Sequence, residues 1–175
     1  MQTSDKKNLL LVDDDDIRID PLKDFLKEAG ITVYHANAPG EAWIYLGKED
    51  IYFHLIVLDL IIPTKGAYSR DVCPSPEICG EIFLKDLRNS KFKNEKIAED
   101  ENKKRRKIKE KYKDIPVVVF TARDLDNSDL PERLKKSPYN AERVDSKKVY
   151  DFEKYAQELM ELILKKKIKE GNHHV

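Results

Sequence analysis

The sequence predicts an α/β protein in which five parallel strands form one sheet with helices on both faces. Short continuous apolar runs, typical of strands that are buried on both faces, recur along the chain. Segments with apolar residues at helical spacing lie between these runs, and acidic or hydroxyl residues follow where several runs end. Strands that alternate with helices favour right-handed crossovers and a mostly parallel sheet.

The elements can be read in order along the chain. The predicted strands are 8–12 (NLLLV), 31–36 (ITVYHA), 53–60 (FHLIVLDL), 115–121 (IPVVVFT) and, more weakly, 141–146. The predicted helices are 17–29, 39–46, 80–88, 130–136 and 151–168. Gly30 stands in the usual stop position after the first helix, and Pro39 is a typical first residue for the second.

Size and charge limit the classes of protein that the chain can represent. Its 175 residues fit one domain with an ordinary hydrophobic core, so we expect residues 1–175 to form a single unit. The 33 Lys and Arg balance the 33 Asp and Glu, which excludes a global attraction to nucleic acid or to an anionic membrane. Only two cysteines occur, and no apolar run approaches the roughly 20 residues of a membrane span. We therefore expect a soluble, cytoplasmic protein.

Two segments do not fit the alternating pattern and are expected to be insertions. The first, about residues 64–79, is irregular and rich in Pro, Ser and Tyr, which is typical of a functional or mobile loop. The second, about residues 91–114, is rich in lysine and has few apolar residues. We expect this second segment to be an excursion that cannot fill a core.

Chemically active residues follow the predicted strands. Asp13 and Asp14 follow the first strand, Asp59 ends the third, Thr121 ends the fourth and Lys147 follows the fifth. Ligand sites of open parallel sheets form at the carboxyl ends of the strands. Because converging carboxylates repel one another, a hard divalent cation between them is expected. The pattern therefore predicts a Mg²⁺ site.

Each of these residues alone has a simpler structural explanation. The DDDD run after the first strand is typical of a solvated turn that caps a helix, threonine is common in strands, and Lys147 is one lysine among many. Asp59 follows a buried apolar run and needs a partner or a bound ion, although it too could cap a turn. The coincidence of all four types at corresponding strand ends favours a functional site.

Together these motifs resemble the receiver domain of the response regulators of two-component signalling. LLLVDDDD resembles the acidic pair, VLDLIIP the phosphoacceptor strand, GEIFLKDLR the helix that follows it, VVVFTA the switch strand and NAERVDSKK the segment with the alanine and the lysine. The resemblance implies a flavodoxin-like, doubly wound sheet of strand order 2-1-3-4-5. It makes Asp59 the phosphoacceptor, with Asp13, Asp14, Asp59 and the backbone carbonyl of Ile61 as the ligands of Mg²⁺ or Mn²⁺.

The resemblance also implies partners and a mode of signalling. A histidine kinase or phosphotransfer protein would supply the phosphoryl group of a phosphorelay, with Thr121 and Lys147 assisting the transfer. A downstream protein would dock on the face made by 130–136, 141–146 and 151–168. Such a domain acts on itself, so we do not expect an enzyme with an external small substrate.

Three features depart from the receiver pattern. The glycine that usually follows the acceptor loop corresponds to Gly80, displaced by the first insertion. Lys148 stands where the family has a proline, and because the alignment is uncertain by one residue, Lys148 is an alternative to Lys147 as the site lysine. Val144 replaces an aromatic residue that many members use in switching.

These departures leave two other readings open. One alternative is a degenerate receiver that binds a protein without being phosphorylated. A nucleic-acid-binding module that uses the basic stretch 103–113 (KKRRKIKEKYK) is less favoured, because Glu95, Asp100, Glu101 and Glu110 lie close by. Cys73 and Cys79 are too few for a zinc site, and we expect both to be reduced.

Overall fold

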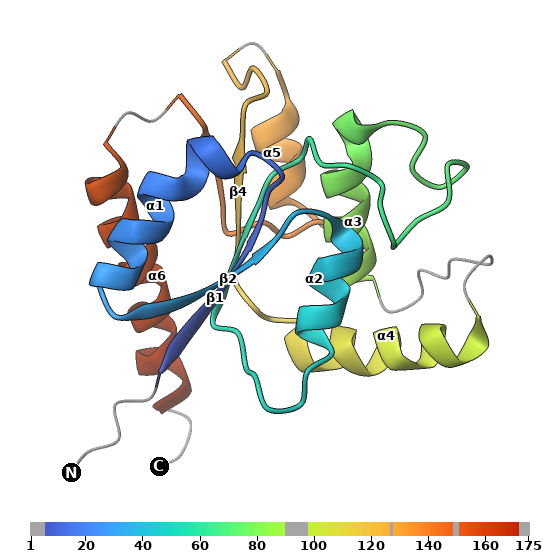
Figure 1. Ribbon diagram of the computed structural model, residues 1–175, viewed down its shortest axis with the longest axis horizontal. Helices are drawn as coiled ribbons and strands as arrows, with labels where there is room; N and C mark the ends of the chain where they lie inside the picture. Colours follow the sequence, from blue (N-terminus) through green and yellow to red (C-terminus); the bar gives the residue numbers. More distant parts are fainter. Residues whose placement is uncertain (1–5, 90–97, 127, 149–150, 172–175) are drawn as a thin grey trace.

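A computed structural model describes residues 6–89, 98–126, 128–148 and 151–171, the last six of these by their backbone only. Five parallel strands form one sheet in the order β2-β1-β3-β4-β5, which confirms the predicted fold class (Figure 1). The strands are β1 (Lys7–Val12), β2 (Ile31–Ala36), β3 (Leu55–Leu58), β4 (Val117–Thr121) and β5 (Arg143–Ser146).

Helices cover both faces of the sheet. On one face lie α1 (Asp16–Glu28) and α6 (Phe152–Gly171), and on the other lie α2 (Pro39–Leu46), α3 (Cys79–Arg88) and α5 (Leu130–Lys135) (Figure 1). Successive strand residues point to opposite faces. In β1, Leu9 and Leu11 therefore pack with α1 and α6, whereas Leu10 and Val12 pack with α2 and α3. This two-sided burial explains why the central strands β1, β3 and β4 are apolar along most of their length.

Most predicted boundaries lie within two residues of the observed ones. The largest difference is the end of the last helix, predicted at residue 168 and observed at Gly171. The third strand was predicted over 53–60 but pairs only over Leu55–Leu58. Phe53 precedes the strand and is still fully buried. The apolar pattern of a sequence indicates which residues are buried, whereas a strand is defined by its backbone hydrogen bonds. Buried apolar residues on either side of the paired segment therefore made the predicted strand longer than the observed one.

The lysine-rich segment differs from the expectation. Within it, α4 (Glu99–Tyr112) lies lengthwise beneath the lower ends of α2 and α3 (Figure 1). Tyr112 is fully buried in the same apolar cluster as α2 and α3, and Arg105 and Lys109 are buried as well. The expectation that this segment cannot contribute to a core was wrong because the aliphatic stems of Lys and Arg bury apolar surface once their charges are paired. Residues 90–97 lie outside the described part.

A buried polar network joins the two segments that we expect to be insertions to the rest of the protein. Asp86 of α3 forms ion pairs with Arg105 (3.4 Å) and Lys109 of α4, and it accepts a hydrogen bond from the Tyr68 hydroxyl (3.0 Å). The Arg105 guanidinium stacks on the rings of Trp43 and Tyr68, and it donates to the carbonyl oxygen of Ala67 (3.2 Å). The loop that carries Tyr68 and the helix that carries Arg105 thus share one anchor, Asp86.

The rest of the first insertion is short of regular structure. A single 3-10 turn, η1 (Pro76–Ile78), leads into α3, and Cys73 and Cys79 are both buried, free thiols. Among the described residues no helix combines the length and the apolar character that crossing a membrane requires.

Candidate functional site

The carboxyl ends of the strands bring the predicted site residues to one edge of the sheet. Val12 and Leu58 are register partners in β1 and β3, so the residues that follow them, Asp13 and Asp59, leave the sheet at the same level. The backbone N–H of Asp59 donates to the carbonyl oxygen of Val12 (2.8 Å). In the same way the N–H of Lys147 donates to the carbonyl oxygen of Thr121 (2.8 Å), which fixes Lys147 at this edge.

The Lys147 ammonium joins two carboxylates. Its Nζ lies 2.7 Å from Oδ2 of Asp13 and 2.7 Å from Oδ2 of Asp59. All three residues are nearly closed to solvent, with exposed fractions of 1% for Asp13, 4% for Asp59 and 8% for Lys147. In such a weakly screened place a triad of two negative charges and one positive charge retains a net negative charge that attracts a further cation.

The remaining carboxylate oxygens are held by the local backbone. Oδ1 of Asp13 accepts from the N–H of Asp15 (3.0 Å), and Oδ1 of Asp59 accepts from the N–H of Ile61 (3.2 Å). These short-range hydrogen bonds fix the orientation of both carboxylates before any ligand arrives.

The acidic residues fit a divalent cation. Asp13, Asp14 and Asp59 each offer a carboxylate oxygen, and the three oxygens lie within 4.8 Å of one another. Asp14 is exposed and so forms the solvent side of the cluster. Oδ2 of Asp13 is buried and, despite its ion pair with Lys147, receives no well-directed hydrogen bond within the described residues. A set of hard oxygen donors with spare acceptor capacity suits Mg²⁺ or Mn²⁺.

Burial and charge act against one another on the pKa values of this site. Burial raises the pKa of Asp13 above its usual 3.8, and the neighbouring Lys147 ammonium only partly offsets this effect. Burial acts to lower the pKa of Lys147, but the carboxylates of Asp59 and Asp13 outweigh it and leave that pKa raised. Lys147 therefore stays cationic, while burial disfavours the charged form of Asp13, a cost that a bound cation would relieve.

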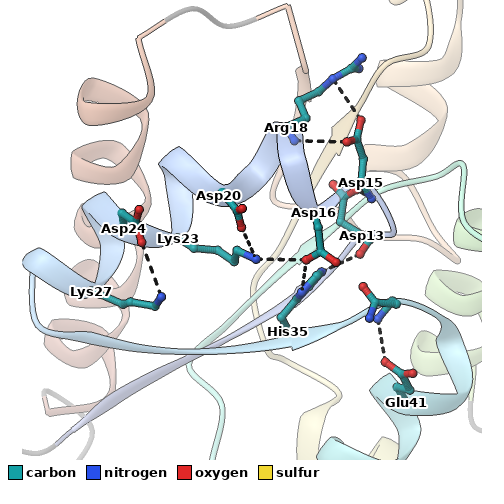
Figure 2. Close-up of polar contacts among 11 residues, drawn as sticks. Asp13, Asp15, Asp16, Arg18, Asp20, Lys23, Asp24, Lys27, His35 and Glu41 are labelled. Atoms are coloured by element: carbon teal, nitrogen blue, oxygen red, sulfur yellow. Dashed lines mark hydrogen bonds and ion pairs between the residues drawn. The ribbon is translucent and has the colours of Figure 1, made fainter.

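His35 supports the loop that carries Asp13, and sequence reasoning missed it. Figure 2 shows His35, from β2, between Asp13 and Asp16. Its Nε2 lies 2.7 Å from the backbone carbonyl oxygen of Asp13, and its Nδ1 lies 3.1 Å from Oδ1 of Asp16. The carbonyl oxygen of Asp13 can only accept, so Nε2 donates to it. Lys23 of α1 pairs with the same Asp16 oxygen (3.1 Å), so the start of α1 is tied to the site loop (Figure 2).

Thr121 is fully buried at the end of β4, and a chain of contacts leads from it to α5. The N–H of Arg123 lies 3.4 Å from Oγ1 of Thr121, and the Arg123 guanidinium binds Oε1 of Glu81 (2.6 Å). Arg133 of α5 binds the other oxygen of Glu81 (2.7 Å). Burial acts to raise the pKa of Glu81, but hydrogen bonds and charges from Arg133 and Arg123 lower it overall. Neither Glu81 nor Arg123 was singled out from the sequence.

The residues that depart from the receiver pattern have defined places. Gly80 is the second residue of α3 and lies against the residues that follow β3, and a Cβ there would lie 2.2 Å from the carbonyl oxygen of Asp59, so only glycine fits. Lys148 is exposed, whereas the side chain of Lys147 is the one that reaches the carboxylates. Val144 lies in β5, is partly buried and packs against the core.

A sheet of order 2-1-3-4-5 with acidic residues at the carboxyl ends of its first and third strands defines a flavodoxin-like fold of the CheY-like receiver type. The chain matches no protein-family model and no curated protein sequence. Among solved structures, the receiver domain of a CheY-like response regulator from Methanospirillum hungatei is similar, with 18% identity, a TM-score of 0.59, and coverage of 94% of this chain and 98% of that one.

Two further structures agree. The signal receiver domain of a putative Luxo repressor protein from Vibrio parahaemolyticus has 17% identity and a TM-score of 0.61, with 94% of this chain and 95% of that chain covered. The signal receiver domain of an HD domain-containing protein from Pseudomonas fluorescens has 15% identity and a TM-score of 0.63, with 98% and 96% covered. These likenesses confirm the resemblance to receiver domains at the level of fold.

Proposed function

We propose that the protein is a phosphoacceptor receiver domain of a phosphorelay, in which Asp59 accepts a phosphoryl group from a phosphohistidine on a kinase or phosphotransfer protein. The observation that carries this proposal is the position of the Lys147 ammonium, 2.7 Å from the carboxylates of both Asp59 and Asp13. Lysine in that place neutralises the acceptor before attack and can pair with a phosphoryl oxygen afterwards.

The chemistry needs positioning more than acid–base catalysis. An oxygen of the Asp59 carboxylate attacks phosphorus, the new O–P bond forms, and the P–N bond to the donor imidazole breaks. Mg²⁺ held by Asp13, Asp14, Asp59 and the Ile61 carbonyl would neutralise charge on the transferring group. The N–H of Ile61 keeps Oδ1 of Asp59 oriented, and Lys147 screens the carboxylate pair from the negative phosphoryl group.

Signalling would follow from the added charge. A phosphoryl group on Asp59 brings further acceptor oxygens that compete for the Thr121 hydroxyl and for Lys147. A movement of Thr121 would displace Arg123, and Glu81, which binds both arginines, would transmit this displacement to Arg133 on α5. The face made by α5, β5 and α6 is therefore the surface that we expect a downstream protein to read. The two buried free thiols support a reducing, cytoplasmic location.

The test is phosphorylation by a small phosphodonor such as acetyl phosphate, with Mg²⁺, followed by mass spectrometry of the intact chain. We expect one phosphoryl adduct in the wild type, none in Asp59→Asn, and a strongly reduced yield in Asp14→Asn and in the presence of EDTA. Asp24→Asn, which alters an exposed carboxylate of α1 away from the site, is the matched control and should label like the wild type.

An unlabelled wild type with intact fold would instead favour the degenerate receiver that acts by binding alone. The nucleic-acid reading is weakened by the positions of Arg105 and Lys109. Both are buried against Asp86, so two cations of the basic stretch are not available to a phosphate backbone.

A further inference from the structure

A groove that the receiver fold alone would not contain lies between α2 and α4. It has a volume of about 850 Å³ and is lined by α2 and the residues that follow it, from Gly40 to Glu49, and along α4 from Glu101 to Lys111. The first insertion closes one end through Lys65 and Gly66, and the N–H of Gly40 donates to the carbonyl oxygen of Lys65 (3.2 Å). Both insertions therefore build this groove, at a place separate from the carboxylate site.

The groove is preformed. Arg105 of α4 is locked to Asp86 and stacks on Trp43, and the methyl carbon Cδ1 of Ile108 lies 3.4 Å from the position that a Cβ at Gly47 would take. The side-chain contacts of Arg105 with Trp43 and of Ile108 near Gly47 set the spacing of the two walls. A ligand that enters would not have to separate the helices first, which lowers the cost of binding.

The lining combines an apolar strip with an excess of positive charge. Ile44 on α2 is 67% exposed, and Ile108 on α4 lies on the same groove. Six basic side chains border the groove against three acidic ones, in a chain whose net charge is +0. In the part of the chain that the structure describes, Lys65, Lys104 and Lys107 form no ion pair with an acidic side chain.

We infer that this groove binds an acidic amphipathic segment of a partner protein. The lining of α4 spans residues 101–111, about 15 Å at the rise of an α-helix, so the cations are spread along a line and do not converge on one point. A phosphate group requires convergent donors, and a lipid surface requires a convex or flat patch. A helix with carboxylates on one side and two or three apolar residues on the other matches both the apolar strip and the basic side chains that border it.

The experiment is a selection of random 16-residue peptides on the full-length chain, followed by titration of the enriched peptides. Trp43 is the single tryptophan, is 4% exposed and lines the groove, so its fluorescence reports binding at this place. We expect enriched peptides to carry Asp or Glu together with Leu, Ile, Phe or Met at helical spacing. Their binding should change Trp43 fluorescence and weaken as salt is added.

A groove variant and a matched control locate the site. Ile44→Asp with Lys104→Glu and Lys107→Glu changes only exposed residues of the groove, and we expect affinity to fall at least tenfold. Leu164→Asp with Lys136→Glu and Lys154→Glu makes the same change in charge and apolar surface on other exposed residues and should bind like the wild type.

Several outcomes would overturn the inference. Enriched peptides without an acidic bias, or equal binding by the two triple variants, would show that the groove does not select acidic segments. Displacement of the peptide by ATP, or binding of anionic phospholipid vesicles that the groove variant abolishes, would assign the groove to another ligand. Self-association of the wild type that the groove variant abolishes would assign it to a second copy of the chain. None of these results depends on whether Asp59 is phosphorylated.

Discussion

Lys147 and Asp59 are 88 residues apart in the chain, yet the ammonium of one donates a hydrogen bond of 2.7 Å to the carboxylate of the other. The contact closes the site, because Lys147 also pairs with Asp13 and so spans the ends of β1, β3 and β5. Removal of this one charge would leave two carboxylates facing each other where water hardly reaches.

Lys147→Met is therefore expected to lower the free energy of unfolding by about 3 kcal/mol without divalent cations, since it leaves buried charges unpaired. Added Mg²⁺ should recover more stability in this variant than in the wild type, because the cation takes over the neutralisation. Urea denaturation with and without Mg²⁺ measures both effects. Lys148→Met, at the exposed neighbour, should stay within about 0.5 kcal/mol of the wild type. Equal midpoints for the two variants would contradict the assignment.

Gly80→Ala tests the contact between α3 and the residues that follow β3. The added methyl group would lie 2.2 Å from the Asp59 carbonyl oxygen and 2.5 Å from Cα of Leu60, so the backbone has to move. We expect a loss of about 2 to 3 kcal/mol in thermal or urea unfolding, together with slower phosphorylation. Gly47→Ala, where the nearest atom is 3.3 Å away and φ is −80°, should change stability by less than about 1 kcal/mol. A Gly80 variant as stable as the Gly47 variant would show that α3 is free to shift.

Asp86→Asn tests the anchor of the two insertions. The change removes the buried carboxylate that pairs with both Arg105 and Lys109, and we expect a loss of about 3 to 5 kcal/mol. Hydrogen exchange should show that amides of α4 lose protection first. Glu101→Gln removes only the half-exposed partner of Arg105 and should cost less than about 1 kcal/mol. Unchanged protection of α4 in the Asp86 variant would mean that apolar packing alone holds the helix.

The link between α3 and α5 should depend on pH. Because Arg133 and Arg123 keep the pKa of Glu81 below its usual 4.5, against the effect of burial, their pairing stabilises the folded state fully above pH 4.5 and is lost as the pH falls through the lower folded value. Glu81→Gln should cost about 1 to 2 kcal/mol at pH 7, since Arg133 is partly exposed and screened. The difference from the wild type should shrink as the pH drops below 4.5. Glu132→Gln, an exposed change on α5, serves as the comparison, and a difference that is constant with pH would rule out the pairing.

The fold could be predicted because its central strands, β1, β3 and β4, are buried on both faces. Runs such as those around Leu10, Val57 and Val118 have no polar face, which only a parallel sheet covered on two sides explains. The lysine-rich helix could not be predicted in the same way. Its buried positions are filled by Arg105 and Lys109, and a pattern of charges does not reveal which of them finds a carboxylate from another helix.

The sequence predicted the site residues that lie at the ends of strands, but not the residues that hold those site residues in place. The choice between Lys147 and Lys148 stayed open because β5 is short and only partly buried, so its register is weakly marked in the sequence. His35 and Glu81 meet their partners over separations of 22 and 42 residues, and nothing local distinguishes them from other polar side chains.

The shared anchor at Asp86 limits how the chain can be shortened by engineering. Arg105 depends on the carbonyl of Ala67 and the ring of Tyr68, while Tyr68 and Arg105 both depend on the same carboxylate. A truncated form that kept α4 but lacked the loop with Ala67 and Tyr68 would retain the charged guanidinium of Arg105 without two of its contacts. Trimming toward a minimal scaffold therefore has to excise both segments together and replace Asp86 with an apolar residue in the same step.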